Sequence, residues 1–263
     1  HPDDTQRWAE DVEAYATKLR RIGRTTFTYD NAGRVTQTVT KRLSKKPLVK
    51  HFYYGSGTQP VGFTDSDHPN VGWRYLYDGL RRRVGKEQVD VATGDVITRV
   101  MYFHRGNRIY GEQQVINNQE PHLAGTGKLW PIDPLTGETL GQIELTPGGT
   151  PDDWSQDQVD AVFYAMVSDF AGVPKELIDV STGEIVGYSK QSLFGQRKWY
   201  GVNSSPLLFT GQYEDAESGW AYNRFRYYNA TFGMYNAQDP LGAEPNIANP
   251  QGYVSNPTTW MDP

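Results

Sequence analysis

A five-residue phrase that begins with Asp and ends with Gly recurs along this chain, and it constrains the fold more than any other feature. It appears as DVATG from Asp90, DPLTG from Asp133, DVSTG from Asp179 and DAESG from Asp215, with NATFG from Asn229 as a looser copy. An Asp or Asn side chain can accept a hydrogen bond from the backbone two residues further on, and a Gly in the last position can adopt a positive φ. Each copy therefore predicts a short hairpin loop between two antiparallel strands.

The segments that flank these turns alternate with a period of two residues, as β-strands do. In WRYLYD, the alternation places Trp73, Tyr75 and Tyr77 on one face. In WAYNRFRYY, the residues expected to share a face are Trp220, Tyr222, Arg224, Arg226 and Tyr228. YDNAGRV from Tyr29 and the shorter YDGLRRRV from Tyr77 repeat the same strand, turn and strand. This repetition favours a repeat array over a compact sandwich.

The composition agrees with a mainly β fold. The 263 residues include 17 Tyr, 7 Trp and 10 Phe, which favour strands, and 27 Gly and 16 Pro, which favour turns. The net charge of −5 gives no general attraction to nucleic acid, and Arg81 to Arg83 are expected to form a solvated strand edge. The absence of cysteine excludes disulfides, zinc thiolates and a cysteine nucleophile. No apolar run approaches the length of a transmembrane helix.

Some segments depart from the strand pattern. Residues 5–21 are predicted to form an amphipathic helix, because apolar residues recur at steps of four and three at Trp8, Val12, Tyr15, Leu19 and Ile22. Residues 159–166 fit either a helix capped by Ser155 or a buried strand. Residues 117–153 are expected to be a long surface excursion between repeats.

These patterns divide the chain into three parts. The expected parts are a helical segment over residues 1–24, a repeat region over 25–238 and an irregular, proline-rich segment over 239–263. A start at His1 rather than Met indicates a piece of a longer protein or a processed product.

The carboxy-terminal part of the repeat region carries a longer motif. SPLLFTGQYEDAESGWAYNRFRYYNATFGMYNAQDPLG, residues 205–242, closely resembles the core motif of the Rhs family, the bacterial toxin proteins with YD repeats. DFAGVPKELIDVSTGEIV from Asp169 and YDNAGRV from Tyr29 are similar to other motifs of that family. The resemblance implies a spiralling antiparallel β-strip that forms part of a hollow shell around a toxin domain. It also implies an irregular plug after the strip, and self-cleavage of the chain beyond the plug.

Two Asp-Pro pairs, Asp239-Pro240 and Asp262-Pro263, lie in the predicted plug. By themselves, such dipeptides are usually turn initiators. The resemblance implies instead that Asp239 and Asp262 are a catalytic pair, in which one carboxylate acts as a base toward water and the other donates a proton to the carbonyl oxygen. It also implies that Arg226 takes part, by holding one carboxylate ionised or by polarising the scissile carbonyl, with Arg224 as the alternative.

Other kinds of site are less favoured. The five histidines show no metal-ligand spacing, and DSDH at residues 65–68 is more typical of a polar loop before a proline than of a cation site. The aromatic faces permit carbohydrate binding, although packing between strands explains them as well. A glycosidase would need two acids on either side of one cleft, and no such pair stands out. No cofactor and no metal are expected.

The sequence thus predicts a structural shell segment that is an enzyme only toward its own chain. Because 263 residues contain too few repeats to close a shell, the expected partners are further shell segments or a second copy, together with the protein's own toxin domain. The resemblance also implies a spike protein of a secretion apparatus and a chaperone as partners, whereas the net charge gives no reason to expect nucleic acid. The location that the resemblance implies is the bacterial cytoplasm, followed by secretion or delivery to a target cell by a type VI secretion system.

Overall fold

The described part of the chain consists almost entirely of antiparallel strands in two sheets, a large one of 16 strands and a small one of four. The computed structural model describes residues 12–15, 18–116, 126–145 and 155–239. Within the large sheet each strand pairs with the next one along the chain, from β1 to β16. Both sheets are therefore built from consecutive hairpins, as the repeated turn phrases predict.

We call the large sheet the wall and the small one the inner sheet. The strands of the wall are β1 (Val12–Tyr15), β2 (Lys18–Ile22), β3 (Thr25–Tyr29), β4 (Val35–Thr40), β5 (Leu48–Tyr54), β6 (Pro60–Asp65), β7 (Val71–Tyr77), β8 (Arg83–Asp90), β9 (Val96–Arg105), β10 (Arg108–Ile116), β11 (Gly127–Leu129), β12 (Gly141–Leu145), β13 (Phe163–Ser168), β14 (Pro174–Asp179), β15 (Ile185–Gln191) and β16 (Arg197–Gly201). The inner sheet contains β17 (Tyr213–Asp215), β18 (Trp220–Asn223), β19 (Arg226–Asn229) and β20 (Met234–Tyr235). A short helix, α2 (Gln156–Asp160), precedes β13.

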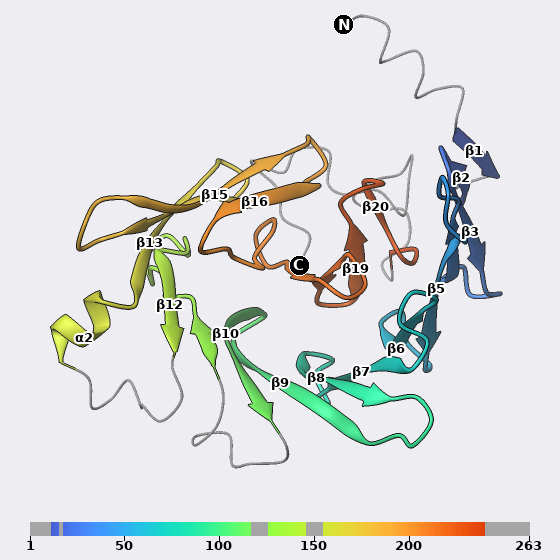
Figure 1. Cartoon of the computed structure of the whole chain (residues 1–263), viewed down its shortest axis with the longest axis horizontal. Coiled ribbons are helices and arrows are strands. Elements are labelled where there is room, and N and C mark those ends of the chain that lie inside the picture. The colour runs from blue at the N-terminus through green and yellow to red at the C-terminus, as the bar shows by residue number, and fades with distance from the viewer. Residues whose placement is uncertain (1–11, 16–17, 117–125, 146–154, 240–263) are drawn as a thin grey trace, which may run out of the picture.

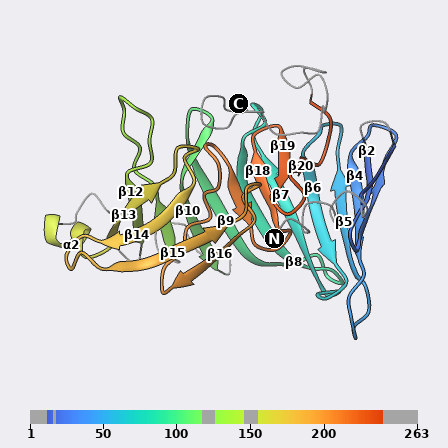
Figure 2. The ribbon, with the colours of Figure 1, turned by 90° about the horizontal axis from the view of Figure 1, so that it is seen from above.

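The wall curves into an open arc, and the inner sheet lies on its concave side. Figure 1 shows the arc running from β1 and β2, through β7 to β10, to β15 and β16, with β19 and β20 inside it. Figure 2 shows the strands of the wall side by side around β18 to β20. The wall and the inner sheet share one core of buried aromatic and aliphatic side chains, among them Phe27, Phe52, Tyr75, Tyr102, Trp220 and Tyr227. Burial of these side chains joins the two sheets.

The repeated phrases form the turns that the sequence predicts. The N–H groups of Ala92 and Thr93 donate to Oδ1 of Asp90 at 2.8 and 2.9 Å. These two hydrogen bonds hold the pKa of the Asp90 carboxyl below its usual range. The closing glycine of every copy has a positive φ, between 66° and 78°, in Gly94, Gly137, Gly183, Gly219 and Gly233. The positive φ of the closing glycine is thus confirmed in all five copies. The side-chain hydrogen bond of the first residue is confirmed in the copies that begin at Asp90, Asp133, Asp179 and Asn229.

The structure corrects the helix predicted over residues 5–21 wherever it describes that segment. Residues 12–15 and 18–22 form β1 and β2, which pair as a hairpin at the end of the wall. β2 also pairs with β3, and Leu19 and Ile22 pack against the main core. Helical spacing was misleading here because two consecutive short strands can show it by coincidence: Leu19 and Ile22 lie on the core side, whereas Val12 is 40% exposed. Pairing also satisfies the backbone groups of β3, which a helix cannot do.

The predicted surface excursion over residues 117–153 is wrong for its described part. Residues 127–129 and 141–145 form β11 and β12, two consecutive strands of the wall. Trp130 is 1% exposed, and its indole N–H donates to the side chain of Gln142 at 2.9 Å. The strands on either side of the turn at Asp133 are too short to show a clear alternation in the sequence.

The ambiguous segment near residue 160 contains both of the proposed elements. Ser155 caps α2 with a capping box, in which its side chain accepts from the N–H of Gln158 and the Gln158 side chain accepts from the N–H of Ser155. The helix ends at Asp160, and residues 163–168 then form β13. Because a short helix is followed directly by a strand, the sequence of this segment shows neither a clear helical period nor a clear strand period.

Candidate functional site

The inner sheet has two sides with different surroundings. Its wall-facing side carries Tyr213, Asp215, Trp220, Tyr222, Tyr227 and Met234, and its far side carries Ala221, Asn223, Arg226, Tyr228 and Tyr235. On the far side, the apolar residues pack against Leu208 and Phe209 in a second core. All residues of β18 and β19 are buried, so both sides of this sheet are covered.

This arrangement corrects the face that the sequence predicts for residues 220–228. A turn at Arg224 and Phe225 separates β18 from β19, and Asn223 pairs with Arg226 across it. Arg224 adopts a positive φ of 49°, as the first loop residue of a tight hairpin can. The turn changes the phase of the alternation, so that Tyr227, and not Arg226 or Tyr228, shares a side with Trp220 and Tyr222.

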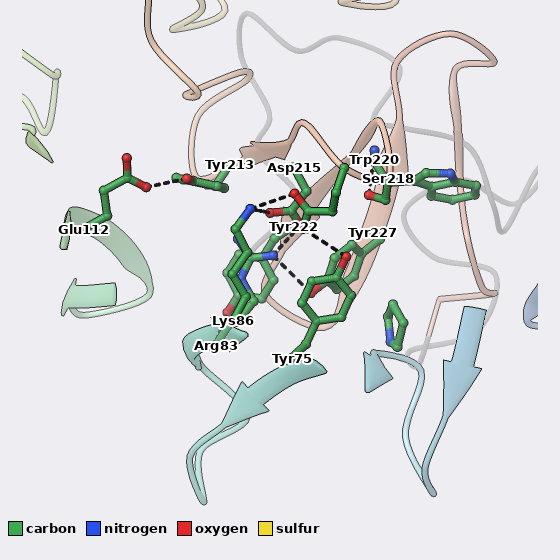
Figure 3. A network of polar contacts seen from close by, with 12 residues as sticks. Tyr75, Arg83, Lys86, Glu112, Tyr213, Asp215, Ser218, Trp220, Tyr222 and Tyr227 are labelled. Atoms are coloured by element: carbon green, nitrogen blue, oxygen red, sulfur yellow. Dashed lines mark hydrogen bonds and ion pairs between the residues drawn. The ribbon is translucent and has the colours of Figure 1, made fainter. Parts of the chain in front are cut away.

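A buried ionic cluster joins the wall-facing side of the inner sheet to the wall. We call it the clamp, and it consists of Arg83 and Lys86 from β8 with Asp215 and Glu217 from the β17–β18 hairpin. Figure 3 shows Arg83 and Lys86 extending from the wall to Asp215 on the inner sheet. Arg83 Nη1 pairs with Asp215 Oδ2, while Lys86 Nζ lies 3.1 Å from Asp215 Oδ1 and 2.8 Å from Glu217 Oε2. Two acids therefore hold two cations across 129 or more residues of sequence.

Arg83 is fully buried, with 0% of its surface exposed, in a cage of tyrosine rings. Its guanidinium carbon lies 4.6 to 5.8 Å from the ring centroids of Tyr102, Tyr222, Tyr213, Tyr75 and Tyr227. Nε and Nη2 have no hydrogen-bond partner among the described residues. Cation–π attraction to several rings compensates in part for these unpaired donors. The expected solvated edge at Arg81 to Arg83 is therefore wrong for its last residue.

Burial and the neighbouring charges oppose each other in the clamp. Burial alone would lower the pKa of the Lys86 ammonium, but Asp215 and Glu217 raise it well above its usual range. Burial and the nearby Asp215 carboxylate raise the pKa of Glu217. Each charge thus depends on its partners to remain stable in the interior.

The far side of the inner sheet holds two of the predicted catalytic residues together. Arg226 Nη2 lies 2.7 Å from Asp239 Oδ2, and the two side chains are only 5% and 9% exposed. Arg224 contacts different groups, namely the side chain of Asn107 at 2.5 Å and the carbonyl of Leu80 at 3.0 Å. Of the two candidate arginines, Arg226 is the one that pairs with Asp239. Asp262 lies outside the described residues.

The chain is similar to proteins that are named as Rhs deoxyribonucleases and as a DNA deaminase toxin. "Probable deoxyribonuclease RhsA" of Dickeya dadantii is 31% identical over 267 aligned residues, which cover 96% of this chain and 16% of the relative. "Double-stranded DNA deaminase toxin A" of Burkholderia cenocepacia is 35% identical over 249 residues, which cover 90% of this chain and 16% of the relative. No protein-family model matches the chain. The chain belongs to the Rhs family.

The fold agrees with this assignment. The crystal structure of TcdB2-TccC3-TEV superimposes on 91% of the Rhs chain, with a TM-score of 0.59 and 18% identity, and the match covers 13% of that protein. The Rhs chain spans about a sixth of the length of the two curated relatives. It is thus comparable to one segment of these longer proteins.

Sequence reasoning anticipated one of these two ionic contacts of the Rhs chain and missed the other, and the catalytic role that it assigns to Arg226 and Asp239 stays a prediction. The pairing of Arg226 with Asp239 agrees with the motif-based expectation. The clamp was missed, although the YD turn contained a signal for it: Tyr77 pairs with Arg83 across the hairpin, and cross-strand partners share a face. The alternation places Tyr77 with Tyr75 on the core side. Its partner Arg83 is therefore expected on the core side as well.

Other candidate sites gain no support from the described part of this Rhs chain. No group of three or more His, Asp or Glu residues there could hold a metal ion. None of the described helices is long and apolar enough to cross a membrane. Trp220, which the carbohydrate hypothesis would use, is 2% exposed and packs against Phe52 with ring centroids 5.4 Å apart. Its ring is therefore part of the core.

Glu112 forms a second polar contact between the wall and the inner sheet. This contact allows the effect of a buried carboxyl on folding stability to be tested. It accepts a hydrogen bond from the hydroxyl of Tyr213, and burial raises the pKa of its carboxyl. A carboxyl whose pKa is raised by folding destabilises the folded state progressively as the pH rises through that pKa. We therefore expect Glu112→Gln, which still accepts the hydrogen bond, to increase the urea midpoint at pH 8 and to have a smaller effect at pH 4. Glu184→Gln, in an exposed turn, controls for net charge, and an equal effect of Glu112→Gln at both pH values would contradict the prediction.

Proposed function

We propose that this chain is a wall segment of an Rhs-type toxin shell, which encloses a toxin domain of the same polypeptide and cuts the chain to release it. The observation that carries the proposal is the buried ion pair of Arg226 and Asp239 on the far side of the inner sheet. The wall is an open arc with this sheet on its concave side, which is the side that a shell would turn toward its contents.

The relatives support a containment role for the region that they share. The names of two of them indicate different activities, a deoxyribonuclease and a DNA deaminase, although both match nearly the whole of this chain. The shared segment covers only 16% of each of these relatives, so most of each protein lies outside it and can account for the different activities. We therefore assign the toxic activity to other parts of such proteins, and to this chain the structural role.

Partners and location follow from the same proposal. Further wall segments, from the same polypeptide or from a second copy, would pair with the end strands β1 and β16, because an open sheet presents unpaired backbone groups there. The enclosed toxin domain would be the main partner. A spike protein and a chaperone of a type VI secretion system would serve delivery from the bacterial cytoplasm to a target cell.

The proposed cleavage is a hydrolysis with two carboxylates. Asp239, as the carboxylate of the ion pair, would take a proton from the attacking water while the new C–O bond forms at the scissile carbonyl. Asp262 would supply a proton to the carbonyl oxygen. As the C–N bond breaks, Asp239 would pass the proton that it took from water to the leaving amine, and Asp262 would take a proton back from a hydroxyl of the tetrahedral intermediate. Arg226 would hold Asp239 in position for this step. One water is consumed, and one acid and one amine terminus are formed.

The test is to express the full-length protein and the variants Asp239→Asn, Asp262→Asn and Arg226→Ala, and to determine the masses of the products. We expect the unaltered protein to be cut shortly after Pro263 and each Asp variant to be reduced at least about 100-fold in cleavage rate. Asp169→Asn, in a turn of the wall, is the matched control and should be cut normally. Intact polypeptide from the unaltered protein, or cleavage that persists in both Asp variants, would refute the self-processing part of the proposal.

A further inference from the structure

Arg226 lies on an aromatic platform that belongs to the same side of the inner sheet. Its guanidinium carbon is 3.8 Å from the centroid of the Tyr235 ring, the closest cation–ring approach recorded for a described arginine. The Tyr235 hydroxyl accepts a hydrogen bond of 2.7 Å from Nδ2 of Asn223. Asn223 is in turn the cross-strand partner of Arg226. Three adjacent strands are therefore linked: Asn223 of β18 holds Tyr235 of β20, whose ring lies against the guanidinium of Arg226 on β19.

The Tyr235 ring is held in place by further aromatic rings. Tyr235 is fully buried and packs edge-on against Tyr228, with ring centroids 5.4 Å apart, and Tyr228 packs edge-on against Phe209 at 6.0 Å. Such rings have few accessible rotamers, so the Tyr235 ring is fixed before the arginine packs on it.

A fixed ring limits what a long and flexible arginine side chain can do. A guanidinium that stacks on a ring lies roughly parallel to it, and its N–H groups then point outward within its own plane. In this structure one of them points at Asp239, with 2.7 Å between Nη2 and Oδ2. Without the ring, the guanidinium loses the surface that selects this orientation.

We propose that Tyr235, held by Asn223, is a positioning residue for self-cleavage: its ring sets the orientation in which Arg226 holds the Asp239 carboxylate. The inference rests on the proposed function, since it concerns the same reaction. It assigns to Tyr235 a role through Arg226 and no contact with the scissile bond.

The first experiment measures self-cleavage of the full-length protein, made by cell-free translation with a pulse of labelled amino acid and followed on gels. Tyr235→Leu removes the ring, and we expect its first-order rate constant to fall about 10-fold or more. Tyr235→Phe keeps the ring and loses the hydroxyl, so we expect a decrease of about 3-fold. Tyr222→Leu removes a buried ring from the wall-facing side and controls for destabilisation, with an expected decrease below about 3-fold.

The second experiment distinguishes positioning from a general packing role. In Arg226→Ala, free guanidinium ion at millimolar concentration should restore part of the cleavage, because the ring and the Asp239 carboxylate remain to bind it. The same ion should restore much less in Arg226→Ala combined with Tyr235→Leu. A ring that served only for packing would not affect this rescue in protein that is still folded, as judged by limited proteolysis.

The outcomes separate this inference from the proposed function. Uncut wild-type protein, or cleavage that persists in Asp239→Asn, overturns both. Cleavage that depends on Asp239 and Arg226 but proceeds at the wild-type rate in Tyr235→Leu overturns the positioning role alone. Equal rescue by guanidinium with and without the ring does the same.

Discussion

Asp215→Asn is expected to lower the free energy of unfolding by about 3–5 kcal/mol, because it breaks a buried ion pair by removing one partner. Arg83 has 0% of its side chain exposed and makes its ion pair with this carboxylate. Lys86 also contacts Asp215, and Glu217 then remains as its other anion. The loss of one negative charge therefore leaves two buried cations with one carboxylate. Urea denaturation followed by tryptophan fluorescence measures the effect.

Asp179→Asn is a matched control, because it makes the same change at the same position of the repeated phrase. Asp179 accepts from the N–H groups of Ser181 and Thr182, and an asparagine side chain can accept the same bonds. Its variant should therefore differ little from the wild type. Adding Arg83→Met to Asp215→Asn should recover part of the lost stability, since it removes the unpaired cation. A loss below about 1 kcal/mol in Asp215→Asn would show that the clamp does not stabilise the fold.

The hairpins were predictable because their determinants lie within a few residues. In the YD turn, the backbone N–H and Nε of Arg34 both donate to the Asp30 carboxylate, at 3.0 and 2.7 Å. Arg82 and Asp78 repeat this arrangement at 2.8 and 2.7 Å. Side chains four residues apart can close such turns without help from the rest of the chain. Turns whose determinants are this local can be predicted from a single sequence.

The strands β1, β2, β11 and β12 were mispredicted because their structure depends on pairing with other strands. β2 pairs with the edge of β3 and β1 pairs with β2, while β11 and β12 lie between β10 and β13. Short strands carry little periodic signal of their own, and pairing determines their conformation. The clamp is a longer-range case, since Asp215 occupies a turn phrase like that of Asp90 but uses its carboxylate to bind Arg83.

The ion pair of Arg226 and Asp239 shows how alternation and resemblance complement each other. The motif indicates Arg226 and Asp239, whereas the alternation places Arg226 on the wrong side until the turn at Arg224 is recognised. With that turn, one side of the inner sheet binds the wall and the other presents Arg226. Because successive side chains of a strand point to opposite faces, the residues that attach the inner sheet to the wall lie on one side and those of the proposed reaction on the other.

Asn236 connects these two roles, because it fixes the chain between the inner sheet and Asp239. Its Oδ1 accepts from the N–H of Tyr227 at 2.7 Å, and its Nδ2 donates to the hydroxyl of Tyr54 at 3.0 Å and to the carbonyl of Thr58 at 2.9 Å. Its backbone N–H donates to the carbonyl of Tyr227, and its carbonyl accepts from the N–H of Val35, both at 2.8 Å. The residue is 1% exposed, so its polar groups depend on these partners and not on bulk solvent.

Asn236→Ala is therefore expected to lower the free energy of unfolding by about 2–4 kcal/mol, because it leaves the N–H of Tyr227 and the carbonyl of Thr58 buried without their side-chain partner. Asp239 lies three residues further on, so the variant that still folds should also cut itself more slowly, by about 10-fold, as its carboxylate is held less firmly against Arg226. Urea denaturation and the pulse-labelled cleavage assay measure the two effects separately. Asn107→Ala removes an exposed asparagine that contacts Arg224, and a change below about 0.5 kcal/mol is expected there. If Asn236→Ala lost stability but kept the wild-type cleavage rate, the backbone of residues 237–239 would have to be held by other contacts, and Asn236 would serve only to attach the inner sheet to the wall.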